Sequence, residues 1–173
     1  VLAVAMVVTL IVSITSCNRN QNQTTGSAMQ NTEATNAAET QPQEERVKLA
    51  AVGDIIAHET ILNLAQTGDG YDFTSLFAQM KPDIASVDLA IGNVETPLGG
   101  GPYTGYPTFN TPDEMGTAVI DAGFDVALQS SNHAMDAGAD GVHHGISFWK
   151  SHENEILMTG LHASQAEADA IPT

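Results

Sequence analysis

Cysteine is nearly absent from this sequence: Cys17 is the only one among 173 residues, so the chain cannot form an internal disulfide. Lysine and arginine are also scarce, with five in all against 21 aspartate and glutamate residues, and the formal net charge is −16. Such a chain has no basic surface with which to meet a phosphate backbone, which excludes nucleic acid as an expected partner. The acidic excess fits a soluble surface and does not disfavour metal binding.

The longest apolar run stands at the start of the chain, over residues 1–14, and contains no charge. It has the length of a signal-peptide core and is short for a membrane span. It leads into Thr15, Ser16 and the lone Cys17, which resembles a bacterial lipoprotein signal in which the cysteine is lipidated. We therefore expect a signal peptide over 1–17 and a lipid anchor on the extracytoplasmic face of the cell membrane. An uncleaved anchor helix is the alternative.

No Met and no basic residue precede the apolar run, so the N-terminus is expected to be incomplete. Residues 18–45 are rich in Asn, Gln, Thr and Glu and poor in aliphatic side chains. A segment of this composition buries too little apolar surface to order itself. We interpret it as a disordered tether between the membrane and a domain over 46–173.

In that domain, short apolar runs alternate with segments of helical periodicity, which predicts an α/β fold. The best-marked helix begins with Thr111 as the expected N-cap, with Glu114 completing a capping box, and ends at Gly123. Strands are expected over 47–54, 86–95, 124–129 and 156–160, and helices over 58–66, 73–80, 111–123 and 139–153.

Three of the expected strands end on polar residues: Asp54, then Asn93 and Glu95, then Asn132 and His133. Successive strand ends of a right-handed α/β sheet lie side by side at one edge. Carboxylate, amide and imidazole groups together suit Mn²⁺, Fe or Zn²⁺. A carboxylate can bridge two ions about 3.5–4 Å apart, and such a pair activates water for attack on phosphorus. Taken singly, each residue also fits a turn, a cap or a core position.

Two further side chains are candidates for supporting roles. His58 stands one turn beyond Asp54 in the sequence. Asp136 follows His133 by three residues and either orients that imidazole or caps the next helix, and the sequence favours the cap. The remaining histidines are expected on helix surfaces.

Four motifs, in this order, resemble the CapA family of capsule synthesis proteins, the poly-γ-glutamate type within the calcineurin-like metallophosphoesterases. The motifs are AVGDIIAHE (51–59), DLAIGNVETPL (88–98), PTFNTPDEM (107–115) and AGFDVALQSSNHAMDAG (122–138).

The resemblance implies a four-layer αββα sandwich with two divalent ions, Mn, Fe or Zn, at the strand ends. It assigns Asp54, Glu95 and Asn132 as metal ligands with Asn93 beside them, and His133 as the residue that acts on the leaving group or the transition state. Ser131 stands where the family often has Asn. The family's later histidine motifs are expected beyond Thr173, so the chain is expected to hold only the N-terminal half of the sandwich and of the site, and whether it is an enzyme stays open.

The first functional interpretation is a membrane-tethered protein that acts in making or exporting an anionic surface polymer, with that polymer or its synthesis machinery as partner. The second is a non-catalytic, polymer-binding scaffold in which the loop with Tyr103, Tyr106 and Phe109 forms the binding surface. The third is a solute-binding lipoprotein, which leaves the polar strand ends unexplained.

Overall fold

The computed structural model describes residues 8–12 and 45–170. Cys17, most of the N-terminal apolar run and nearly all of the expected tether lie outside the described residues, so the lipid anchor and tether stay predictions. Within the described part of the chain, no helix is both long and apolar enough to cross a membrane.

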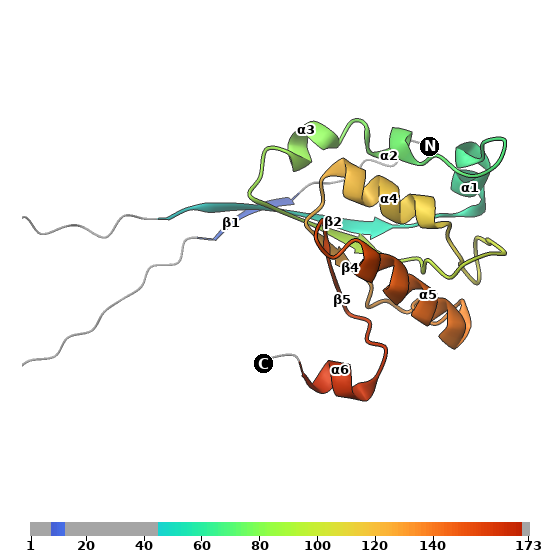
Figure 1. The fold of residues 1–173 in the computed structure, drawn as a ribbon. Coiled ribbons are helices and arrows are strands. Elements are labelled where there is room, and N and C mark those ends of the chain that lie inside the picture. Colours follow the sequence, from blue (N-terminus) through green and yellow to red (C-terminus); the bar gives the residue numbers. More distant parts are fainter. Residues whose placement is uncertain (1–7, 13–44, 171–173) are drawn as a thin grey trace, which may run out of the picture.

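A single five-stranded sheet forms the centre of the domain, in the order β1-β2-β3-β4-β5 (Figure 1). Strand β1 runs antiparallel to β2, and the four strands from β2 to β5 are parallel. The parallel strands put all their carboxyl ends at one edge of the sheet. The strands are β1 (Val8–Val12), β2 (Val47–Ile55), β3 (Leu89–Val94), β4 (Val126–Leu128) and β5 (Leu157–Thr159).

Helices connect the parallel strands, as the alternating pattern predicts for an α/β fold. Because the strand order follows the chain order and such crossovers are right-handed, these connections cover the same face of the sheet. Figure 1 shows α1 to α4 along one side of it. The helices are α1 (Glu59–Ala65), α2 (Thr74–Phe77), α3 (Lys81–Ile84), α4 (Asp113–Ala122), α5 (Gly138–Ser151) and α6 (Gln165–Asp169).

The core lies between the helices and one face of the sheet. Along β3, Ala90, Gly92 and Val94 are buried whereas the alternate residues are only half-buried, as the two-residue period of a strand requires. The opposite face carries apolar side chains that stay partly in solvent, and Leu157 there is 63% exposed. Parallel sheets are normally covered on both faces, so this face is the less protected of the two.

The structure differs from the sequence-based expectations at Thr111, in the helix expected over 73–80, and in strand β1 and helix α6, neither of which was expected. Thr111 is not the N-cap of α4: it is fully buried and its hydroxyl donates to the hydroxyl of Thr96, and Pro112 precedes the helix. The single helix expected over 73–80 is shortened to α2. A separate turn of helix, α3, begins at Lys81 with Pro82 in its first turn, where a missing backbone N–H is tolerated. Strand β1 was not expected at all, although its residues Val-Thr-Leu-Ile-Val favour extended backbone.

Gln129 joins three elements just past the end of β4. Its side chain is 3% exposed, donates to the carbonyl of Val94 in β3, and accepts from the indole N–H of Trp149 in α5 at 3.2 Å. Both partners are buried, so neither has water as a replacement partner. This amide therefore ties α5 to the ends of β3 and β4.

We expect Gln129→Leu to lower the free energy of unfolding by about 2–4 kcal/mol, because it leaves a buried carbonyl and a buried indole N–H unpaired. Urea titration followed by tryptophan fluorescence measures this directly, since Trp149 is the only tryptophan. The exposed Gln66 provides the control Gln66→Leu, expected to change stability by about 0.5 kcal/mol or less. Equal effects of the two substitutions would contradict a specific role for the Gln129 amide.

Candidate metal centre

An irregularity in β2 directs the first candidate residue. Val52 pairs with Gly92, and Ile55 pairs with Val94. Between these two pairs β2 has two residues, Gly53 and Asp54, whereas β3 has only one, so β2 contains one extra residue. Ile55 thereby takes the core-facing position that strict alternation would give to Asp54. Bulges of this kind re-aim side chains beside functional sites. Asp54 is left exposed at the strand end.

The carboxylate of Asp54 meets residues from the end of β3. The amide nitrogen of Asn93 donates to Asp54 Oδ1 at 2.7 Å and lies 3.5 Å from Glu95 Oε2. The amide therefore lies between two carboxylates from adjacent strands. The structure thus brings Asp54, Asn93 and Glu95 together, as their positions at strand ends predict.

The pKa of Glu95 is raised above its ordinary value. The largest cause is partial burial, followed by the hydrogen bond and the negative charge of Asp54, whereas the neighbouring His133 acts in the opposite direction. Each of the raising causes disfavours a charged Glu95. A cation at this position would offset that cost.

The loop after β4 supplies the imidazole. His133 Nδ1 lies 2.7 Å from Asp136 Oδ2, and the two side chains are 19% and 16% exposed. Asp136 does not cap the next helix, contrary to the favoured interpretation: α5 begins at Gly138 after Ala137, which makes no side-chain cap. Asp136 is engaged instead by His133 and by the backbone N–H of Phe109, which donates at 2.8 Å.

Ser131 connects this loop to the carboxylates, a role that sequence reasoning missed. Its hydroxyl donates to the carbonyl of Glu95 at 2.8 Å and accepts from the backbone N–H of His133 at 3.1 Å. The side chain therefore ties the end of β4 to the end of β3. Asn132, between Ser131 and His133, is exposed in the same turn. The sequence signal that could have indicated this role is Ser131 itself, a hydroxyl residue at a position where the family often has Asn.

His58 is the N-cap residue of α1, but its side chain makes no capping hydrogen bond and faces the loop between β3 and α4. Its ring packs against Phe109 with centroids 5.1 Å apart and lies 6.4 Å from Tyr106. Of the loop aromatics, Phe109 is buried and Tyr106 is 75% exposed. His58 therefore belongs to an aromatic cluster at the rim of the strand-end residues.

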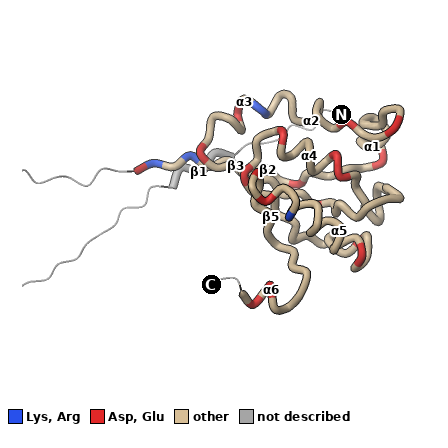
Figure 2. The backbone as a smooth tube through the Cα atoms, in the orientation of Figure 1, with Lys and Arg blue, Asp and Glu red and all other residues tan. Residues whose placement is uncertain are grey.

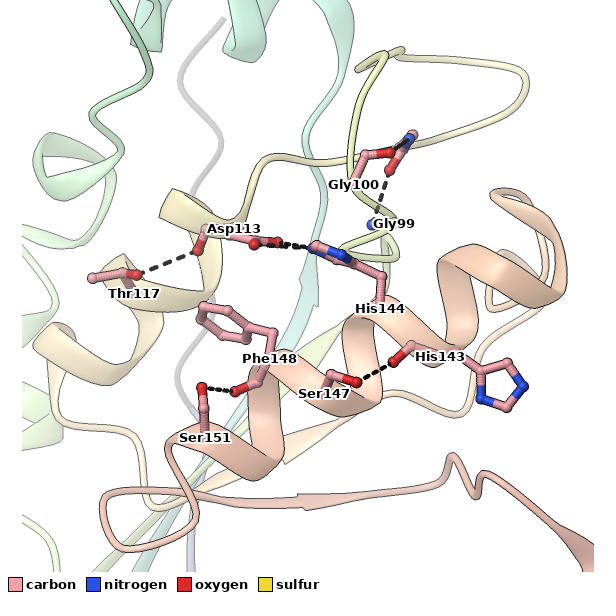
Figure 3. Close-up of polar contacts among 10 residues, drawn as sticks. Gly99, Gly100, Asp113, Thr117, His143, His144, Ser147, Phe148 and Ser151 are labelled. Carbon is pink, nitrogen blue, oxygen red and sulfur yellow. Dashed lines mark hydrogen bonds and ion pairs between the residues drawn. The ribbon is translucent and has the colours of Figure 1, made fainter.

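A second His–Asp pair provides a comparison. His144 of α5 contacts both carboxylate oxygens of Asp113 at 3.0 Å, at the beginning of α4 (Figure 3). These side chains are 41% and 38% exposed, about twice the values for His133 and Asp136. The more protected pair is the one beside the carboxylates.

Positive side chains are remote from the strand ends. Among the described residues, the lysines and arginines stand at the start of β2, at the start of α3 and near the end of α5 (Figure 2). The start of β2 and the neighbouring α3 lie toward the amino ends of the strands (Figure 1). The end of α5 lies on the same side, because a helix that connects parallel strands runs against them. No lysine or arginine of the described chain is among the groups that shift the pKa of Glu95 at the strand ends.

Within residues 8–12 and 45–170, no group of three or more His, Cys, Asp and Glu side chains is arranged to hold a metal ion. The chemistry of the strand-end donors nevertheless fits a hard or borderline divalent ion, because two adjacent carboxylates share one amide and the pKa of Glu95 is raised there. The described chain thus contributes part of a donor set. A hollow of about 440 Å³ lies elsewhere, between α5, β5 and α6.

The fold and these residues define an α/β protein with an acidic, histidine-bearing centre at the carboxyl ends of parallel strands. The chain belongs to the bacterial capsule synthesis protein PGA_cap family, whose sequence model matches residues 48–173. The match covers every candidate residue of the centre and indicates a role in capsule biosynthesis. The comparison with curated proteins gives no match.

We expect Asp54→Asn to lower the pKa of Glu95 toward its ordinary value, because the substitution removes the neighbouring charge. Carboxyl-carbon NMR titration in the presence of a chelator measures the shift. A raised folded-state pKa means that the contribution of Glu95 to stability is lost as pH rises through that pKa, so the variant should lose less stability over that interval. Asp88→Asn, at the other end of the sheet, is the control; an unchanged Glu95 pKa in Asp54→Asn would refute the interaction.

Proposed function

We propose that this protein acts in the synthesis or export of a capsular polymer, poly-γ-glutamate or a related anionic chain, as a lipid-anchored protein on the extracytoplasmic face of the bacterial membrane. Its centre would be of the metallophosphoesterase type. The observation that carries the proposal is the meeting of Asp54, Asn93 and Glu95 beside the His133–Asp136 pair at the ends of adjacent parallel strands.

The residues that would hold divalent ions are Asp54 and Glu95 through their carboxylates, with the amide oxygens of Asn93 and Asn132 as further donors. Asn93 would have to turn its amide, since its nitrogen faces Asp54; the assignment of amide oxygen and nitrogen follows from the hydrogen-bond network. Bound ions would supply Lewis acidity and an activated water for attack on phosphorus.

His133 would protonate the leaving group: Nε2 would first take a proton from water and then donate it to the leaving oxygen. A carboxylate only accepts hydrogen bonds, so contact with Asp136 keeps the proton of a neutral imidazole on Nδ1. That arrangement leaves Nε2 as the atom able to take or return a proton. General acid–base catalysis by a positioned histidine contributes roughly 10²–10⁴-fold to rate.

The distribution of charge supports a metal rather than a basic pocket. Among the described residues, lysine and arginine are remote from the strand ends, so an anionic phosphoester or polymer would need another source of positive charge there. Divalent ions held by two carboxylates provide one.

A non-catalytic polymer-binding scaffold is the second candidate, and exposed Tyr106 favours it. The other aromatics of the loop are engaged elsewhere, because Phe109 is buried and Tyr103 packs edge-on against Tyr71. A binding surface on this loop would therefore depend on Tyr106. Loss of polymer binding in Tyr106→Ala, with binding that survives chelation in the wild type, would support the scaffold.

Metal analysis by mass spectrometry tests the first candidate. We expect near-stoichiometric Mn, Fe or Zn in the purified domain completed at its C-terminus, and a loss of about tenfold or more in metal affinity for Asp54→Asn. We expect His133→Ala to keep most of the metal and to lose about 10²-fold or more of any phosphoesterase turnover. Asp88→Asn and His152→Ala, which change the same residue types away from the centre, should behave as wild type. A folded protein without metal above background would refute the proposal.

A further inference from the structure

We infer that Phe109 is a positioning residue for His133 through its ring, which packs on the imidazole beside a carboxylate that the Phe109 backbone amide also contacts. The inference deepens the proposed function, because it concerns how the imidazole at the proposed centre is held. Phe109 comes from the loop between β3 and α4, whereas His133 and Asp136 come from the loop after β4.

The backbone contact fixes the oxygen that His133 uses. Phe109 N–H donates to Asp136 Oδ2 at 2.8 Å, and His133 Nδ1 lies 2.7 Å from the same oxygen. A carboxylate held by one donor has less freedom to turn away from the other. The Phe109 amide thus restrains the carboxylate that selects the Nδ1–H form of a neutral imidazole.

The ring contact restrains the imidazole itself. The Phe109 ring is 2% exposed and lies 4.7 Å from the His133 ring, centroid to centroid, with an interplanar angle of 84°. The same ring meets His58 edge-on at 5.1 Å and 78°. Edge-to-face pairs at these separations are favourable beyond the area that they bury. One phenyl ring therefore packs with both histidines of the strand-end region.

The loop that carries Phe109 is itself fixed. The neighbouring Asn110 side chain accepts from Gly99 N–H at 2.9 Å and donates to the carbonyls of Gly100 and Pro102 at 3.2 and 3.0 Å. At Gly105, a Cβ atom would lie 2.5 Å from the Glu59 backbone nitrogen, so the loop packs directly on the start of α1. Phe109 is consequently presented from a rigid frame rather than from a free loop.

The test uses long-range ¹H–¹⁵N NMR of the histidine side chains in the protein kept metal-free with a chelator. In the wild type we expect the neutral His133 ring to be predominantly the Nδ1–H tautomer. Phe109→Leu should shift it to a mixture of both tautomers, and Phe109→Tyr, which keeps an aromatic ring, should restore the single form. The His133→Ala spectrum identifies the signal among the six histidines.

Phe148→Leu is the matched control. Phe148 packs 4.8 Å from His152, whose Nδ1 lies 2.9 Å from Glu155, so the same substitution is made beside another His–carboxylate pair. It should leave the His133 tautomer unchanged. Where Phe109→Leu does not fold, Phe109→Met, whose unbranched side chain adapts more readily to an irregular space, takes its place in the comparison.

A His133 tautomer that stays single in folded Phe109→Leu or Phe109→Met would overturn the inference. The same result would follow if Phe148→Leu produced an equal shift, because the effect would then be a general loosening of the domain. The readout needs neither metal nor turnover. A shifted tautomer in a protein that never binds metal would therefore uphold the role of Phe109 while removing the proposed function.

Discussion

One extra residue in β2 is the constraint on which the strand-end centre depends. The bulge at Gly53 and Asp54 lets Ile55 enter the core opposite Val94 while the Asp54 carboxylate turns toward Asn93. Without it, alternation would place a carboxylate where an isoleucine is now buried, at a cost in desolvation. The same extra residue thus lets Ile55 pack in the core and places the Asp54 carboxylate near Glu95.

Local sequence patterns predicted the strand ends and one helix end, whereas contacts between distant residues were not predicted. The expected strands end near Asp54, Asn93 and His133. Because the ends of consecutive parallel strands lie at one edge of a sheet, these three residues were predicted to lie close together. Gly123 was predicted as a helix end, and it has φ of 97° there. Thr111 is a residue type that is common at N-caps. Its hydroxyl instead donates to the hydroxyl of Thr96, 15 residues away, in the core.

The bulge, the Ser131 bridge and the Phe109 contacts were not predictable, because each depends on residues that are far apart in the sequence and meet only in the folded chain. Asp54 and Asn93 are 39 residues apart, and Phe109 and Asp136 are 27 residues apart. Local propensity carries no information on such distances. The family resemblance supplied the roles of the ligands, whereas the geometry supplied the supporting residues, which come from loops of ordinary composition.

The placement of the few lysines has a practical consequence. The described chain carries lysine at 48, 81 and 150, toward the amino ends of the parallel strands. Coupling through these amines to a sensor chip or resin attaches the domain by that end. The opposite edge of the sheet, with Tyr106 and the strand-end carboxylates, then points into solution. A domain immobilised in this way keeps that edge of the sheet unmodified. It is therefore suited to binding measurements with long polymers, which need an unobstructed approach.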